Sequence, residues 1–161
     1  TKQMAMFINE CILGYDRIYS DRDGEKVEYI YANVFKNAPY VLFEKIKECI
    51  RKGYKPDDIF VLAYSFRSES APPKKLEHML ISHGIPCYLP NNDENRLDKD
   101  VIKGKVCFTT FHQSKGRERP VVIVYGFDKS HFIYYNIFSV FLQYKKGLFC
   151  NMIWLNQKLA C

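Results

Sequence analysis

The chain has 161 residues, of which 47% are hydrophobic and 16% aromatic. That length holds one domain with one core, and so many core-forming side chains exclude an intrinsically disordered chain. The formal charge of +6 is compatible with a polyanionic partner, although ordinary solvated surfaces also carry such an excess.

The cysteines indicate a reducing compartment. There are 6 of them, spread along the chain without a C-x-x-C pair, and most lie in apolar runs, so we expect an intracellular protein with reduced core thiols. The longest stretch without Asp, Glu, Lys or Arg, residues 130–144, is short and interrupted by polar side chains, which argues against a membrane span. The N-terminus shows no signal peptide pattern, and Thr1 in place of Met indicates a fragment or a trimmed chain.

Helix and strand patterns alternate along the first part of the chain. Apolar residues three and four apart predict a helix over 4–14. Turn residues at 21–25 precede a β-branched and aromatic run that predicts a strand at 27–31. A second helix is predicted over about 40–52, because the helical spacing continues there up to a glycine.

The middle of the chain predicts a parallel sheet. Residues 59–64 are continuously apolar, which is typical of a strand buried on both faces. Ser70, followed by two prolines, predicts the start of a helix that continues to Gly84. A short strand is predicted at 85–88, before a polar, exposed connection over 91–105.

Two further strands are predicted at 106–110 and 121–125, on either side of a polar loop. Strands that alternate with helices predict an α/β fold with a mainly parallel sheet, whose ligands bind beyond the carboxyl ends of the strands. We assign this domain to residues 1–128. For the aromatic-rich tail, 129–161, two interpretations stay open: an irregular helix packed on the sheet, or out-of-frame or otherwise non-native sequence.

The polar loop carries the candidate chemistry. Thr110 and His112 can donate hydrogen bonds to phosphates or sugars. Lys115 supplies a compact charge, and Gly116 lets backbone N–H groups approach a ligand closely. The carboxylate of Glu118 repels phosphate but accepts hydrogen bonds from ribose hydroxyls. Each residue alone also fits a structural role, and it is their order and spacing that favour a nucleotide or nucleic-acid site.

The same loop resembles a helicase motif. The T-x-H-x-x-K-G-x-E spacing of 110–118, followed by the aliphatic run 120–126 that ends in Gly, resembles motif V of superfamily 1 UvrD/Rep-like ATP-dependent DNA helicases. Residues 76–88 resemble that family's L-E-x-x-L-x-x-x-G-I-P-x-Y helix and strand, and 59–65 would be its motif IVa strand. Residues 1–9 are similar to the helix after the motif IV arginine, which would lie just before them.

The resemblance covers about residues 1–128 and implies the second RecA-like domain of such a helicase, with a mainly parallel sheet flanked by helices. The implied partners are single-stranded DNA and the first RecA-like domain. The implied cofactor is ATP with Mg²⁺, bound mainly by that first domain. The short connection in place of an accessory domain, and the F-H-Q-S-K-G wording of the loop, resemble helicases of large DNA viruses.

The resemblance also assigns roles residue by residue. Thr110 and His112 would contact single-stranded DNA, and Ser65 is a weaker candidate for the same role. Gly116 and Glu118 would approach the nucleotide, with the carboxylate on the ribose.

Other positions depart from the family pattern. Lys115 is a supporting residue whose role could be structural. Arg117 and Arg119 stand where the family has Leu and an aromatic residue, and we expect them to add positive charge to the loop. Arg67 lies three residues later than the arginine usual after the motif IVa strand, where this chain has Tyr64, so that role is not transferred.

The ATP-cleaving parts of a helicase are missing from the sequence. No G-x-x-x-x-G-K-[ST] P-loop occurs, and the Asp93-Glu94 pair does not follow an aliphatic strand as a Walker B motif would. The aromatic-V-A-x-[ST]-R signature of motif VI is also missing. We therefore predict no catalytic and no metal-ligating residue, and no ATP hydrolysis by this chain alone.

Three functions stay open at this point. The leading one is the second motor domain of a helicase, which closes on ATP bound by a first domain and moves along DNA. The alternative is a non-catalytic RecA-like remnant that binds nucleic acid or a protein partner. The third is a degraded reading frame without function.

Overall fold

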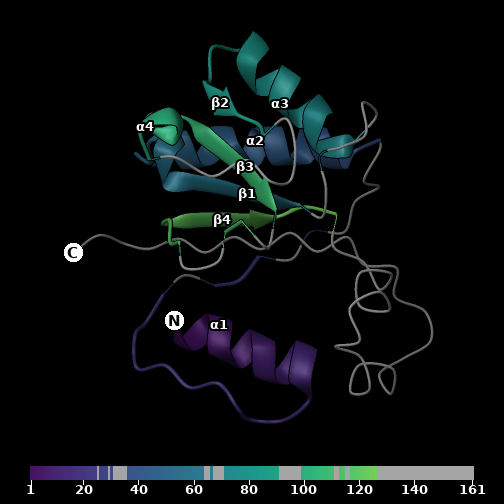
Figure 1. The fold of residues 1–161 in the computed structure, drawn as a ribbon. Helices are drawn as coiled ribbons and strands as arrows, with labels where there is room; N and C mark the ends of the chain where they lie inside the picture. The colour runs from purple at the N-terminus through teal and green to yellow at the C-terminus, as the bar shows by residue number, and fades with distance from the viewer. Residues whose placement is uncertain are drawn as a thin grey trace.

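A parallel β-sheet forms the centre of the molecule (Figure 1). The computed structural model describes residues 1–24, 26–28, 30, 36–63, 66, 71–90, 99–110, 113–114 and 117–126, without the side chains of 11–13 and 99. The strands are β1 (Ile59–Ala63), β2 (Cys87–Tyr88), β3 (Val106–Thr110) and β4 (Val121–Val124). Their order is β2-β3-β1-β4, and each neighbouring pair is parallel. The predicted α/β class with a parallel sheet is confirmed.

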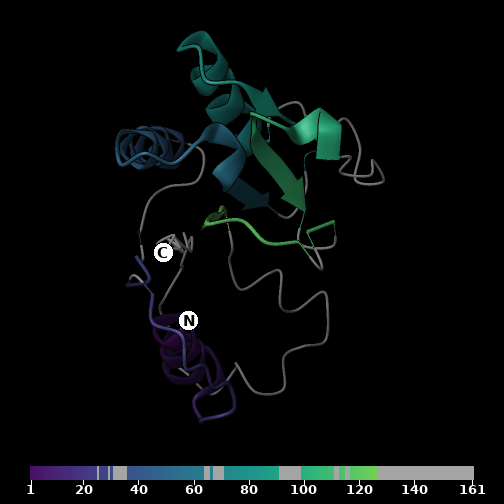
Figure 2. The same ribbon diagram turned by 90° about the vertical axis from the view of Figure 1, so that its left-hand side faces the viewer.

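Helices lie on both faces of this sheet, and the N-terminal helix lies apart from it (Figure 1). In chain order they are α1 (Lys2–Phe7), which continues as the π-helix η1 (Ile8–Leu13), then α2 (Ala38–Arg51), the 3-10 helix η2 (Pro56–Asp58), α3 (Pro72–Ser82) and α4 (Lys99–Ile102). Figure 2 shows the sheet between α2 and α3 on one side and α4 on the other. Three predicted helices are therefore confirmed to within a few residues at their ends.

The main core lies between the sheet and the pair α2 and α3. Alternate residues of a strand point to opposite faces. One set of strand residues, represented by Val61 and Phe108, packs in one cluster with Leu42 of α2 and Leu76 of α3. The other set, represented by Phe60, forms a smaller cluster under α4. Burial on both faces explains why these strands read as continuous apolar runs rather than as alternating patterns.

The N-terminal helix forms a small unit with the segment that returns beside it. The buried side chain of Asn9 donates to the Ile18 carbonyl at 2.9 Å and accepts from the Arg17 and Ile18 amides at 3.2 and 3.0 Å. The Lys2 amide donates to the Arg22 carbonyl at 2.7 Å. The π-helix ends at Gly14, whose φ of 75° is the left-handed conformation that glycine adopts without strain. The predicted stop near Gly14 is confirmed.

The strand predicted at 27–31 is wrong for the residues that are described there. Val27, Glu28 and Ile30 have no strand pairing. Ile30 packs against the main core instead, and Glu28 forms a 2.7 Å ion pair with Lys45 of α2. The pKa of Lys45 is raised, chiefly by its hydrogen bond to Glu28. The described residues of this segment therefore pack on the core and pair with α2 and are not part of the sheet.

The connection predicted over 91–105 is not all exposed coil. It contains α4, where the buried Ile102 packs against Phe60 and Cys107. Helix α3 also begins differently from the prediction, because its N-cap is Ala71 and not Ser70, which lies outside the described residues. The 121–125 strand ends one residue earlier than predicted, and the strand predicted over 59–64 is described as far as Ala63, since Tyr64 lies outside the described residues.

The tail assigned to 129–161 lies outside the described residues, so both interpretations of it stay open. Among the helices that are described, none is long and apolar enough to cross a membrane.

Candidate functional site

Thr110 ends β3 at the carboxyl edge of the sheet, where it meets the side chain of Gln113. The Gln113 side-chain oxygen accepts hydrogen bonds from the Thr110 amide and hydroxyl, both at 3.3 Å, and from the Thr109 hydroxyl at 3.4 Å. In return, the Gln113 amide donates to the Thr110 hydroxyl at 3.3 Å. Gln113 therefore caps the end of the strand with its own side chain.

This cap holds the beginning of the loop after β3 close to the strand. The Ser114 amide donates to the Thr110 carbonyl at 3.1 Å, and the Arg117 amide donates to the Ser114 carbonyl at 3.0 Å. Thr110 is only 3% exposed. A ligand of its hydroxyl must therefore share that oxygen with Gln113 or displace it, and the loop start is organised before any ligand arrives.

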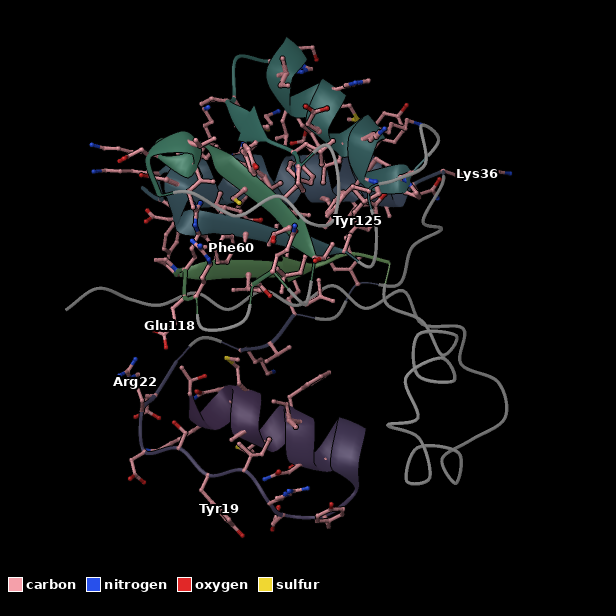
Figure 3. The ribbon with its side chains drawn as sticks, viewed as in Figure 1. Tyr19, Arg22, Lys36, Phe60, Glu118 and Tyr125 are labelled. Atoms are coloured by element: carbon pink, nitrogen blue, oxygen red, sulfur yellow. The ribbon has the colours of Figure 1, made fainter. Side chains whose placement is uncertain are left out.

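Glu118 lies at the opposite edge of the sheet from Thr110. The strand register pairs Ala63 with Thr110 and Ile59 with Val121, so the two edges are separated by the length of β1, about 13 Å at ~3.3 Å per residue. Figure 3 shows Glu118 just before the amino end of β4. Its side chain is exposed. The predicted DNA residue Thr110 and the predicted nucleotide residue Glu118 therefore lie at different edges of the sheet.

Arg119 points into the protein. Its guanidinium donates to the Ile59 carbonyl and to the Lys105 carbonyl, each at 3.1 Å, and lies 4.5 Å from the centre of the Phe60 ring. These partners come from the start of β1 and the residue before β3. This side chain therefore joins the amino ends of two strands, and its charge lies at the amino edge of the sheet.

The charges around Arg119 are consistent with this half-buried position. Burial lowers the pKa of Arg119, while Cys107 and the carboxylates of Asp57 and Asp58 act in the opposite direction. An arginine keeps its charge in proteins because its pKa stays far above neutrality. The two aspartates of η2 therefore help to compensate a cation held against the sheet.

Burial also raises the pKa of the Cys107 thiol from 9.0 to about 11, and that of Cys87 to about 12. In the unfolded chain both thiols ionise above pH 9, whereas in the folded protein they stay protonated. The free energy of unfolding is therefore unaffected by these thiols below pH 9 and falls as the pH rises toward 11. We expect Cys107 alone to account for a loss on the order of 2 kcal/mol over that window. Urea unfolding of wild type and Cys107→Ala at pH 8, 9, 10 and 11 checks this, and equal slopes against pH would contradict it.

Four of the predicted site residues lie outside the described residues: Ser65, His112, Lys115 and Gly116. The structure brings none of the described candidates together, because Thr110 and Glu118 occupy opposite edges. Sequence reasoning missed Gln113 as the partner of Thr110. The sequence signal for Gln113 is its position three residues after the threonine that ends the strand, because a side chain at that distance can fold back and bind the strand end.

Within the part of the chain that the structure describes, no group of three or more His, Cys, Asp or Glu side chains is arranged to hold a metal ion. Comparisons of the chain with protein-family models, with curated proteins and with solved structures find no match. The case for a function therefore depends on the site geometry and on the sequence motifs.

Proposed function

We propose that this chain is the second RecA-like motor domain of a UvrD/Rep-like ATP-dependent DNA helicase. In this role its loop between β3 and β4 contacts single-stranded DNA at one end and ATP at the other. The ATP is held with Mg²⁺ mainly by a first RecA-like domain. The chain is then one half of a motor and does not hydrolyse ATP alone.

The observation that carries the proposal is the path of the loop. Its threonine ends the buried strand β3 at the carboxyl edge, and its glutamate precedes β4, on the other side of β1, at the amino edge. A motor domain has to contact two ligands at two places, because ATP binding at one must change DNA binding at the other. The loop between β3 and β4 is fixed at both ends by strands of one sheet, so it is suited to couple a ligand at the carboxyl edge to a ligand at the amino edge.

The second motif match supports the same proposal. Leu76 and Leu80, the two leucines of the L-E-x-x-L pattern, are fully buried in α3 against the sheet. Gly84, the glycine of the G-I-P pattern, has a φ of 75° and lets the chain turn from α3 toward β2. Three residues that carry the resemblance therefore have structural roles: Leu76 and Leu80 in the core and Gly84 in the turn.

A DNA-binding measurement tests the nucleic-acid half of the proposal. We expect His112→Ala to weaken binding of a fluorescein-labelled oligo-dT by about fivefold, as the loss of one hydrogen bond predicts. Anisotropy titrations at several salt concentrations measure this, because phosphate contacts make affinity salt-dependent. His78→Ala is the matched control, since His78 is an exposed histidine of α3.

The outcome of this test separates the proposal from its competitors. Thr110→Val, with its stability measured in parallel because of the Gln113 cap, is expected to weaken binding as well. Unchanged affinity of the Thr110 and His112 variants at every salt concentration would rule out the DNA assignment.

A further inference from the structure

An exposed aromatic side chain with a cation above it lies at the start of α2 and α3. Tyr40 is 54% exposed, and the ammonium nitrogen of Lys75 lies 4.7 Å from the centre of its ring. Tyr40 belongs to the first turn of α2 and Lys75 to the first turn of α3. We call this pair the Tyr40–Lys75 platform.

The platform lies at the carboxyl edge of the sheet. Helix α2 leads into β1 and α3 follows it, so the first turns of both helices lie near the end where β1 finishes (Figure 1). The same edge holds Thr110, which is paired with Ala63 at the end of β1. Because alternate strand residues share a face, Thr110 lies on the face of Val106 and Phe108, which is the face that α2 and α3 cover.

The two turns that carry the platform are anchored in the core. In α2, Ala38 and Pro39 are buried beside the platform, and in α3 Pro73 and Leu76 are buried. The helices also pack against each other. The exposed ring is therefore held by rigid structure, which reduces the conformational entropy lost when a ligand binds to it.

The described charges in the first turns of the two helices are positive. Neither helix has an acidic residue in its first turn. Lys74 adjoins Lys75, and Lys36 lies just before α2, at the same end of the molecule in Figure 3. Prolines at the start of both helices remove backbone N–H donors, so attraction of phosphate here depends on the lysine side chains.

A second pair of a lysine and an aromatic ring lies on α2, and it differs from the platform in the exposure of its ring. Lys47 lies 4.9 Å from the centre of the Phe43 ring, a geometry close to that of Lys75 and Tyr40. Phe43, however, is only 5% exposed and also contacts the His83 ring at 4.6 Å between ring centres. That ring belongs to the core, whereas more than half of the Tyr40 side chain is exposed.

We infer that the Tyr40–Lys75 platform binds single-stranded nucleic acid, with a base stacked on the Tyr40 ring and the Lys75 ammonium on an adjacent phosphate. Exposed aromatic rings beside basic side chains are the combination by which proteins hold single strands without reading sequence. The inference rests on the proposed function and extends it. The bound single-stranded nucleic acid would run along the carboxyl edge of the sheet, from the Thr110 loop to the starts of α2 and α3.

Titrations of the full chain with oligo-dT test the platform. We expect Tyr40→Ala to weaken binding about fivefold or more, and Tyr40→Trp to restore it, since stacking needs an aromatic ring and not a phenol hydroxyl. Lys75→Gln is expected to lower the slope of log affinity against log salt by about one phosphate contact. Lys47→Gln, which removes the same charge from the core-facing pair, is the matched control and is expected to change affinity less than twofold, roughly the scatter expected for a surface change.

The outcomes separate this inference from the proposed function. Unchanged affinity of Tyr40→Ala, together with weakened binding by His112→Ala, overturns the platform and leaves the helicase proposal intact. No binding of oligo-dT by the wild-type chain overturns both. Equal losses for Lys75→Gln and Lys47→Gln show general charge attraction and overturn the platform. A 2-aminopurine base in the oligonucleotide adds a direct readout, because its fluorescence is quenched by stacking on Tyr40 and recovers in Tyr40→Ala.

Discussion

Replacing Arg119 with leucine is expected to lower the free energy of unfolding by about 2–4 kcal/mol. The guanidinium makes two hydrogen bonds, to the carbonyls of Ile59 and Lys105, and one contact with the Phe60 ring. Leucine keeps part of the packing but leaves both carbonyls without this donor. Ile59 is fully buried, and removing a donor from a buried carbonyl costs more than the hydrogen bond contributes, so the loss is large for a side chain in a loop.

Urea unfolding followed by circular dichroism measures this loss. Arg119→Lys is expected to recover part of the stability, because an ammonium can donate to the same two carbonyls but lacks the flat guanidinium that lies against the Phe60 ring. Arg117→Leu is the matched control, with the same charge change two residues away and an expected effect within about 0.5 kcal/mol. If Arg119→Leu were as stable as Arg117→Leu, Arg119 would not join the strands as described.

Removing the carboxylate of Glu118 is expected to weaken nucleotide binding about tenfold or more in a complete motor, because a hydrogen bond to a charged group is lost. The suitable protein is this chain fused behind a first RecA-like domain that carries a P-loop and Walker B motif. A flexible linker keeps the two domains at high effective concentration. Binding of a fluorescent ATP analogue is the readout, since the chain itself contains no motif VI arginine for hydrolysis.

The position of Glu118 makes this effect selective. It lies at the amino edge of the sheet, about the length of β1 from Thr110, so Glu118→Ala is expected to leave oligo-dT affinity without nucleotide unchanged. Glu44→Ala, which removes another exposed carboxylate on α2, controls for net charge. An equal loss of DNA and nucleotide affinity in Glu118→Ala would contradict the separation of the two sites.

The parts of the fold that were predictable are those with a local signal. The helical spacing of 40–52 and the apolar run of 59–64 depend only on neighbouring residues, and both elements form nearly as predicted. The 27–31 segment has the composition of a strand. In the structure, however, Ile30 packs on the core and Glu28 pairs with Lys45. Composition alone does not distinguish a strand from an apolar segment beside a helix.

The site was predictable only in part for a related reason. Thr110 was placed correctly at the end of β3, because the strand itself was predicted. The direction of the Arg119 side chain was not predictable. Its partners Ile59 and Lys105 are distant in the sequence, and only the parallel register brings them together. The separation of Glu118 from Thr110 follows from the same register.

Thermodynamic coupling between ATP and single-stranded DNA is the most direct test of the proposal that this chain is a motor domain. In the fused protein, the affinity for the ATP analogue is measured with and without saturating oligo-dT. We expect DNA to change nucleotide affinity by about fivefold or more, and nucleotide to change DNA affinity by the same factor, because coupling is reciprocal. Nucleotide affinity that is identical with and without DNA, in a fusion that binds both, would contradict the account.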